Sequence, residues 1–172
     1  MKIFEYIVPG VRQNLAYAER LLKGIPAQLS ARKPVVNGTL IECNHPVFVF
    51  GHLAIYPSQL AQMAGISSDG LEVPERYGSL FQMGSPCQDD PDGTIYPSLV
   101  EVSERFFSGM RAVLERLPEV SQQGMDAPLE HPGRRERFGT VGAFTAYVLL
   151  AHPQSHLGQV SVWRRCMGLG PA

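Results

Sequence analysis

Apolar residues recur at helical spacing in four stretches of this chain. The first stretch begins at Ile3 or Val8 and reaches Lys23, and Gly24 and Pro26 predict its end, because glycine and proline commonly follow helix termini. Its apolar stripe consists of Val11, Leu15, Ala18, Leu22 and Ile25. Steps of three and four residues between these positions predict an amphipathic helix that buries one face.

The second stretch has recognisable signals at both ends. Asn44 or His45 can cap a helix, and Pro46 suits the first helical position. We expect the helix to reach Ala64, with Gly65 as its terminator. Pro57 lies inside this stretch and removes one backbone hydrogen bond, so it predicts a kink one turn beyond His52.

The third and fourth stretches complete the helical pattern. The third starts near Pro97 and ends near Leu117-Pro118, with a stripe of Leu99, Val102, Phe106, Met110, Val113 and Leu117. The fourth starts with Thr140 as cap and extends to about Cys166. Pro153 lies inside it and predicts a local distortion, because the carbonyl of Leu149 loses its backbone partner.

Two segments between these stretches have little periodicity, residues 66–95 and residues 118–138. The first is either a functional lid or a long crossover, and a crossover of this length allows the flanking helices to run parallel. No alternating strand pattern of useful length is visible. The sequence therefore predicts an all-α fold, a single-domain four-helix bundle over residues 1–172 with a long crossover between helices 2 and 3.

The bulk composition narrows the class of protein. The formal net charge is -1 and hydrophobic residues make up 44% of the chain, as in ordinary globular domains. A near-neutral chain lacks the positive excess of a dedicated nucleic-acid binder. The chain contains no apolar run of about 18 residues, so we expect no membrane-spanning helix. Three widely separated cysteines argue against a disulfide framework, so we expect a cytoplasmic protein.

The candidate chemistry centres on histidines. His152 and His156 stand four residues apart in the last predicted helix, which places both imidazoles on one helical face. His52 lies in another apolar helical stretch. Neutral imidazoles are good ligands for divalent metals, and three of them leave coordination positions open for a substrate. If the two helices pack together, His52, His152 and His156 form a metal site.

Neighbouring residues suggest further roles. Gln159 and Trp163 continue the helical stripe of the histidines, and Gln159 can hydrogen-bond a bound water or hold a histidine ring in place. Gly158 predicts the close approach of a neighbouring helix. Tyr56 follows His52 by one turn and is a candidate proton donor or a core residue. Tyr56 and Gln159 are therefore the candidate catalytic residues.

The histidine segments make the chain resemble the DinB-like superfamily of metal-binding four-helix bundles. The resemblance rests on Asn44-His45-Pro46 running into Gly51-His52-Leu53-Ala54, on Tyr96-Pro97-Ser98, and on His152-x-x-x-His156-Leu157-Gly158-Gln159 followed by Arg164-Arg165. It covers nearly the whole chain. It implies parallel second and third helices in an up-down-down-up bundle, and a metal held by His52, His152 and His156. Pro153 departs from the polar or acidic residue that many members carry there.

The resemblance implies a fold more firmly than a reaction. Some members look like transferases that use low-molecular-weight thiols such as bacillithiol or mycothiol. The first hypothesis is therefore a thiol-dependent transferase that uses Zn²⁺, Ni²⁺ or Fe²⁺ to deprotonate a thiol. The second is a hydrolase that uses a metal-bound water. The third is a non-enzymatic metal-binding or ligand-binding stress protein, and the fourth a bundle without metal. The expected partner is a small molecule, and the sequence leaves homodimer formation open.

Overall fold

The computed structural model describes residues 4–172, and within that range the chain is mainly helical. The all-α class expected from the sequence is confirmed. Nine α-helices, three short helical turns and two short strands follow one another as α1 (Phe4–Leu22), η1 (Ala27–Leu29), β1 (Val35–Val36), β2 (Thr39–Leu40), α2 (Pro46–Ala54), α3 (Tyr56–Ala64), α4 (Arg76–Phe81), α5 (Leu99–Arg116), η2 (Leu117–Glu119), α6 (Gln122–Asp126), α7 (Pro132–Phe138), α8 (Val141–Ala146), η3 (Tyr147–Ala151) and α9 (His152–Cys166) among the described residues.

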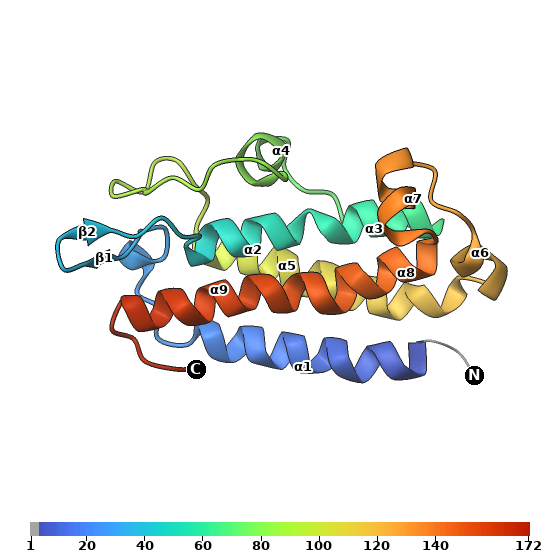
Figure 1. Ribbon diagram of the computed structural model, residues 1–172, viewed down its shortest axis with the longest axis horizontal. Helices are drawn as coiled ribbons and strands as arrows, with labels where there is room; N and C mark the ends of the chain where they lie inside the picture. The colour runs from blue at the N-terminus through green and yellow to red at the C-terminus, as the bar shows by residue number, and fades with distance from the viewer. Residues whose placement is uncertain (1–3) are drawn as a thin grey trace.

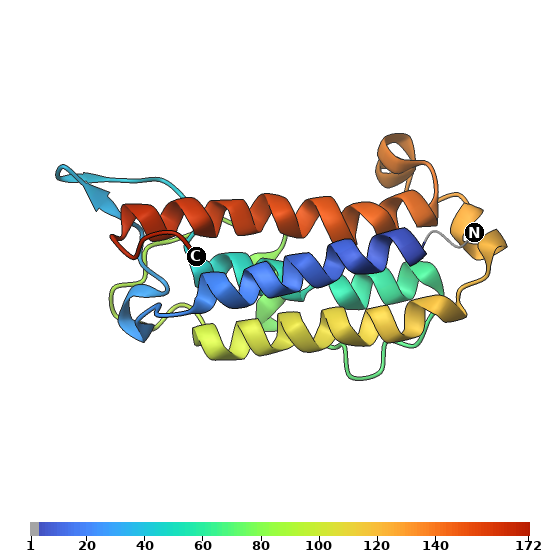
Figure 2. The same cartoon turned by 90° about the horizontal axis from the view of Figure 1, so that it is seen from below.

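Long helical rows lie side by side along the molecule (Figure 1, Figure 2). They are α1, the α2–α3 pair, α5, and the row formed by α8, η3 and α9. The α2–α3 pair and α5 run in the same direction, whereas α1 and α9 run the opposite way (Figure 1). α2 packs against both α5 and α9, and α1 packs against α9. These contacts place residues near position 52 beside residues near position 152.

The predicted apolar stripes form the core of the molecule. On α1, Val11, Leu15 and Ala18 are buried, although Leu21 rather than the predicted Leu22 completes the buried face. On α5 the buried stripe is Val102, Phe106, Met110 and Val113, continued by Leu117. Helical spacing in the sequence therefore identified the inward faces of both helices. No helix within residues 4–172 is both long and apolar enough to cross a membrane.

The expected interruption at Pro57 is present. α2 ends at Ala54 and α3 begins at Tyr56. α3 ends at Ala64 and is followed by Gly65, whose φ of 68° is left-handed. At the start of α2 the His45 side chain accepts a hydrogen bond from the Phe48 backbone N–H, so His45 is the cap. Pro57 packs tightly on α5, where a Cβ added at Gly109 would lie 2.8 Å from the Pro57 Cγ.

The last helical row is also interrupted, beside Pro153. Thr140 caps α8 as expected, but residues Tyr147–Ala151 form a π-helical turn before α9 begins at His152. Because Pro153 has no N–H, the Leu149 carbonyl loses its usual backbone donor. The Asn14 side chain on α1 donates to this turn: its Nδ2 lies 2.9 Å from the Leu150 carbonyl oxygen and 3.5 Å from the Leu149 carbonyl oxygen. Single π-turns inside helices often occur at functional sites.

Asn14→Leu should therefore destabilise the protein and loosen the π-turn. Asn14 is buried, and the change removes its hydrogen bonds to the carbonyl groups of Leu149 and Leu150. One unsatisfied buried group costs about 1–3 kcal/mol. Urea unfolding should show this loss in the free energy of unfolding. A matched control is Gln13→Leu, because Gln13 is exposed on the same helix. Equal stability of the two variants would contradict this role of Asn14.

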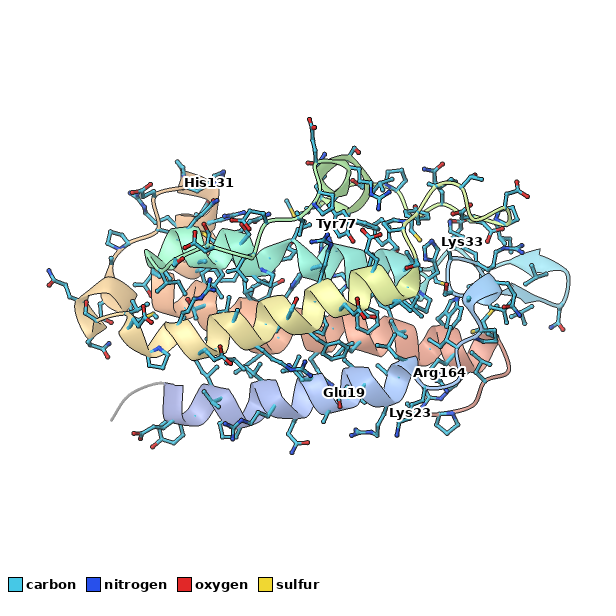
Figure 3. All side chains as sticks on the ribbon, turned by 180° about the vertical axis from the view of Figure 1, so that it is seen from behind. Glu19, Lys23, Lys33, Tyr77, His131 and Arg164 are labelled. Carbon is cyan, nitrogen blue, oxygen red and sulfur yellow. The ribbon has the colours of Figure 1, made fainter. Side chains whose placement is uncertain are left out.

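The two segments expected to be irregular, and the connection between α1 and α2, contain regular structure. Residues 66–95 include α4, whose Tyr77 and Phe81 are fully buried, and Tyr77 lies between α4 and the long helices (Figure 3). Residues 118–138 include η2, α6 and α7. β1 and β2 form a short antiparallel hairpin around Asn37 and Gly38, both at positive φ. The Asn-Gly pair was a hairpin signal, but strands of two residues are too short for an alternating pattern.

Candidate metal centre

Three imidazoles from two helices meet in the interior of the helical array. His52 comes from α2, and His152 and His156 come from successive turns of α9. One ring nitrogen of each histidine lies within 4.8 Å of the others. His52 Nε2 and His152 Nε2 are 3.2 Å apart. Ligand atoms of a tetrahedral zinc ion are separated by about 3.3 Å, because each Zn–N bond is about 2.0–2.1 Å long. The cluster predicted from sequence is therefore present and can hold a metal ion.

In His52 and His156, a hydrogen bond at Nδ1 leaves Nε2 free to bind a metal ion. His52 Nδ1 lies 2.6 Å from the Phe81 carbonyl oxygen, which can only accept, so Nδ1 carries the proton and Nε2 keeps its lone pair. His156 Nδ1 lies 3.2 Å from Gln159 Oε1, which gives His156 the same tautomer. Metal-binding histidines usually have such a second partner, which fixes the ring orientation and raises its basicity.

Gln159 itself is held in place. Its Oε1 also accepts a hydrogen bond from Asn44 Nδ2 at 3.0 Å, so the residue before the cap of α2 helps to orient a ring on α9. Of the two roles considered for Gln159, the geometry shows the positioning of His156. Phe81 was not identified from the sequence, because its contribution is a backbone carbonyl at the end of the short helix α4.

His152 is placed differently from the other two histidines. It is the first residue of α9, immediately after the π-turn, and its Nδ1 is buried without a hydrogen-bond partner among the described residues. Its Nε2, which faces His52, is thus its only nitrogen in polar contact with a protein group. An unpaired buried ring nitrogen is costly, and His152 lacks the second partner that orients the rings of His52 and His156.

The surroundings keep all three rings neutral, the form that binds metal. Burial lowers the pKa of His52 and is also the main cause of the lowered pKa values of the other two. The pKa of His152 falls to about 3, with further contributions from the charges of His156, His52 and Arg137. The pKa of His156 falls to about 4, and the charge of His52 contributes.

These shifts predict that acid destabilises the metal-free protein. Histidines with a folded-state pKa below the unfolded value of about 6.5 bind protons more readily when the chain unfolds. The stability they contribute is present above about pH 6.5 and is lost as the pH falls toward the folded values. Urea unfolding between pH 7.5 and pH 5 should show a decline below about pH 6.5, and bound zinc should steepen it. A flat profile would contradict the buried, neutral rings.

A pocket of about 320 Å³ opens onto the histidines. Tyr56 lies at its wall, with its ring centroid 5.1 Å from that of His52 and 4.3 Å from that of His152. Burial is the main cause that raises the pKa of Tyr56, and the charge of Tyr147 adds to it. The Tyr56 hydroxyl therefore keeps its proton at neutral pH. The remaining lining residues are Asn44, Phe48, Gln82, Met83, Gly84, Ser85 and Tyr147. No carboxylate within residues 4–172 lines this pocket, so a general base of that kind is absent from its walls.

Other residues considered at the sequence level have separate structural roles. Trp163 is fully buried, and its indole N–H donates to the Arg32 carbonyl at 2.7 Å, so it does not extend the histidine site. His45 caps α2 and contacts the Gln88 carbonyl through Nε2. The expectation of a close helix contact at Gly158 is wrong, because a Cβ there would meet nothing within 4 Å.

Comparison with known proteins adds no relative. The chain matches no protein-family model, no curated protein and no solved structure. The geometry of the histidine cluster and its pocket therefore carries the functional argument.

Proposed function

We propose that this protein is a metal-dependent enzyme in which His52, His152 and His156 hold one divalent ion. The observation that carries the proposal is the convergence of three neutral imidazoles beside a pocket, with two rings oriented by second hydrogen bonds. Three protein ligands leave a position for a substrate, as in catalytic rather than structural zinc sites. Imidazole ligands accept Zn²⁺, Ni²⁺ and Fe²⁺, so the ion available to the protein decides among them.

We further propose membership of the DinB-like superfamily. The support is the resemblance in the two histidine segments together with the directions of the helical rows, in which α2–α3 and α5 are parallel and α1 and α9 are antiparallel to them. These directions agree with the up-down-down-up four-helix bundle that the resemblance implies. The long connection of residues 66–95 is then the crossover, and α4 within it supplies the Phe81 carbonyl that orients His52.

Transfer of a thiol is the reaction that we favour, because of the resemblance in the two histidine segments. A metal ion lowers the pKa of a coordinated thiol, which otherwise lies near 8.5, so no protein base is needed. This agrees with pocket walls that carry no carboxylate among the described residues. Tyr56 stands beside two of the histidines with a protonated hydroxyl, so it can donate a proton to the oxygen that leaves when the thiol sulfur bonds to an electrophilic carbon. Hydrolysis by a bound water is the competing proposal.

An assay with a panel of thiols and an electrophilic probe tests this proposal. The zinc-loaded protein should accelerate conjugation of bacillithiol, mycothiol or a related small thiol to an epoxide such as styrene oxide, in which a C–S bond forms, the C–O bond of the ring breaks and the released oxygen takes up a proton. Chelation should abolish the acceleration, and Tyr56→Phe should lower kcat by about 10²–10⁴-fold, the contribution typical of general acids, while zinc stays bound. Turnover of an ester without any thiol would instead identify a hydrolase. Thiol conjugation that persists after complete metal removal would contradict a metal-dependent enzyme.

A further inference from the structure

A second pocket adjoins the histidine pocket. It has a volume of about 540 Å³, within the range of small-molecule sites. The two pockets share Tyr56, Gln82, Met83 and Tyr147, so a molecule bound in one extends toward the other. Helix α7 forms one wall, and His131 marks its beginning in Figure 3. This second pocket is called the α7 pocket below.

The walls of the α7 pocket combine cations with aromatic rings. Arg134 and Arg137 face it from α7, and the rings of Phe138, Phe144 and Tyr147 line it together with Tyr56. Its lining within residues 4–172 includes no Asp or Glu. The local charge is therefore positive before any metal is added. Aromatic walls suit an apolar body, whereas two guanidinium groups suit an anionic group.

Neither arginine is neutralised by an acidic side chain in the described part of the chain. Arg134 donates to Gln59 Oε1 at 3.0 Å and to the Met63 sulfur, both uncharged acceptors. Its guanidinium carbon lies 5.2 Å from the centroid of the Phe144 ring. A carboxylate or phosphate is a stronger acceptor than an amide or a thioether, so it would displace these partners.

Arg137 lies beside two aromatic rings. Its guanidinium carbon lies 5.0 Å from the centroid of Phe138 and 5.3 Å from that of Tyr147. Cation–π attraction to these rings positions the guanidinium without using its N–H groups, which can donate to an anion. Arg134 and Arg137 thus form a pair of positioned donors at one end of a pocket whose other end leads to the three histidines.

We propose that the α7 pocket binds the anionic group of the substrate, a carboxylate or phosphate attached to an aromatic or aliphatic body. Arg134 and Arg137 hold the anion, the aromatic rings contact the body, and the reacting end reaches the histidines past Tyr56. The placement of the reacting end of the substrate at the histidines rests on the proposed metal-dependent function. The binding of the anion rests on the pocket alone.

A larger pocket of about 800 Å³, which Arg134 also lines, is a poorer candidate. Its lining includes Glu130, and it contains neither Arg137 nor any of the three clustered histidines. A ligand there would meet one arginine opposed by an acid and would have no path along shared walls to the histidine pocket. The smaller α7 pocket therefore fits the substrate better than the larger one.

Calorimetric titration of zinc-loaded protein tests the assignment. The probes are 3-phenylpropionate, its neutral analogue 3-phenylpropionamide, and phenyl phosphate, which separates phosphate from carboxylate preference. One anion should bind at least about tenfold more tightly than the amide. Arg134→Gln with Arg137→Gln should weaken anion binding by about 10–100-fold and leave amide binding unchanged. The matched control is Arg12→Gln, because Arg12 is exposed on α1 and lines neither pocket.

The outcomes separate this proposal from the metal-dependent function. Anion binding that depends on both arginines in metal-free protein supports the α7 pocket even if no metal-dependent turnover exists. Equal affinity for anion and amide, no binding of either anion at millimolar concentration, or equal losses in Arg12→Gln and the double variant would each overturn the assignment. Circular dichroism of the double variant should remain that of the parent, since both side chains lie at the pocket surface.

Discussion

His156→Ala should reduce the affinity of the protein for zinc by more than about 100-fold. Loss of a direct ligand is expected to exceed the 10–100-fold that loss of a second-sphere hydrogen bond typically causes. His156 is the best of the three histidines to replace, because it is only half-buried, whereas His52 and His152 are buried. The fold should therefore tolerate the change. Competition with a fluorescent zinc chelator measures the affinity.

A histidine outside the cluster provides the control for this variant. His131 lies at the start of α7, where its Nδ1 accepts a hydrogen bond from the Arg134 backbone N–H. His131→Asn keeps a capping side chain at that position and removes one imidazole. It should bind zinc as the parent does. A similar loss of affinity in His131→Asn, or parental affinity in His156→Ala, would exclude the assigned ligand set.

Gly51→Ala should damage the fold and the site together. A Cβ at position 51 would lie 2.4 Å from the Phe81 ring, which is fully buried and has nowhere to move without displacing its neighbours. Overpacking of this kind costs about 1–3 kcal/mol, despite the better helix propensity of alanine. Because the Phe81 carbonyl orients His52, displacement of Phe81 should also weaken zinc binding by about 10–100-fold.

Gly158→Ala is the matched control for Gly51→Ala. Gly158 lies inside α9 with nothing within 4 Å of an added Cβ, so alanine meets no obstacle there. The change should raise the free energy of unfolding by about 0.5–1 kcal/mol, because glycine is a poor helix former. Urea unfolding and zinc titration of both variants give the comparison. A stable Gly51→Ala variant with parental zinc affinity would contradict the role of Phe81.

The sequence predicted those features that depend on local spacing. Helical periodicity located α1 and α5 and the inward faces of each, and glycine, proline and capping residues located most of the long-helix ends. The spacing of His152 and His156 predicted their shared face, because positions four apart in a helix are neighbours. The meeting of these residues with His52 was conditional on helix packing, which the contact between α2 and α9 supplies.

The features that the sequence did not predict depend on tertiary contacts. The burial of Tyr77 and Phe81 in α4 has no periodic signal, because a helix of six residues is too short to show one. The group that orients His52 is the backbone carbonyl of Phe81. Every residue has a backbone carbonyl, so the residue type does not reveal this contact. Pro153 predicted a distortion, but its form as a π-turn with a hydrogen bond from Asn14 could not be predicted, because Asn14 lies more than a hundred residues away in sequence.

X-ray absorption spectroscopy of the bound metal can show whether the three histidines coordinate one ion. The protein, freed of any metal-binding tag, is reconstituted with zinc and compared with His156→Ala. The geometry of His52, His152 and His156 predicts about one equivalent of zinc with three imidazole nitrogens at about 2.0–2.1 Å, and loss of bound zinc in the variant. A parent protein that retains no zinc, or a zinc ion bound by sulfur or by fewer than three imidazoles, would contradict the account.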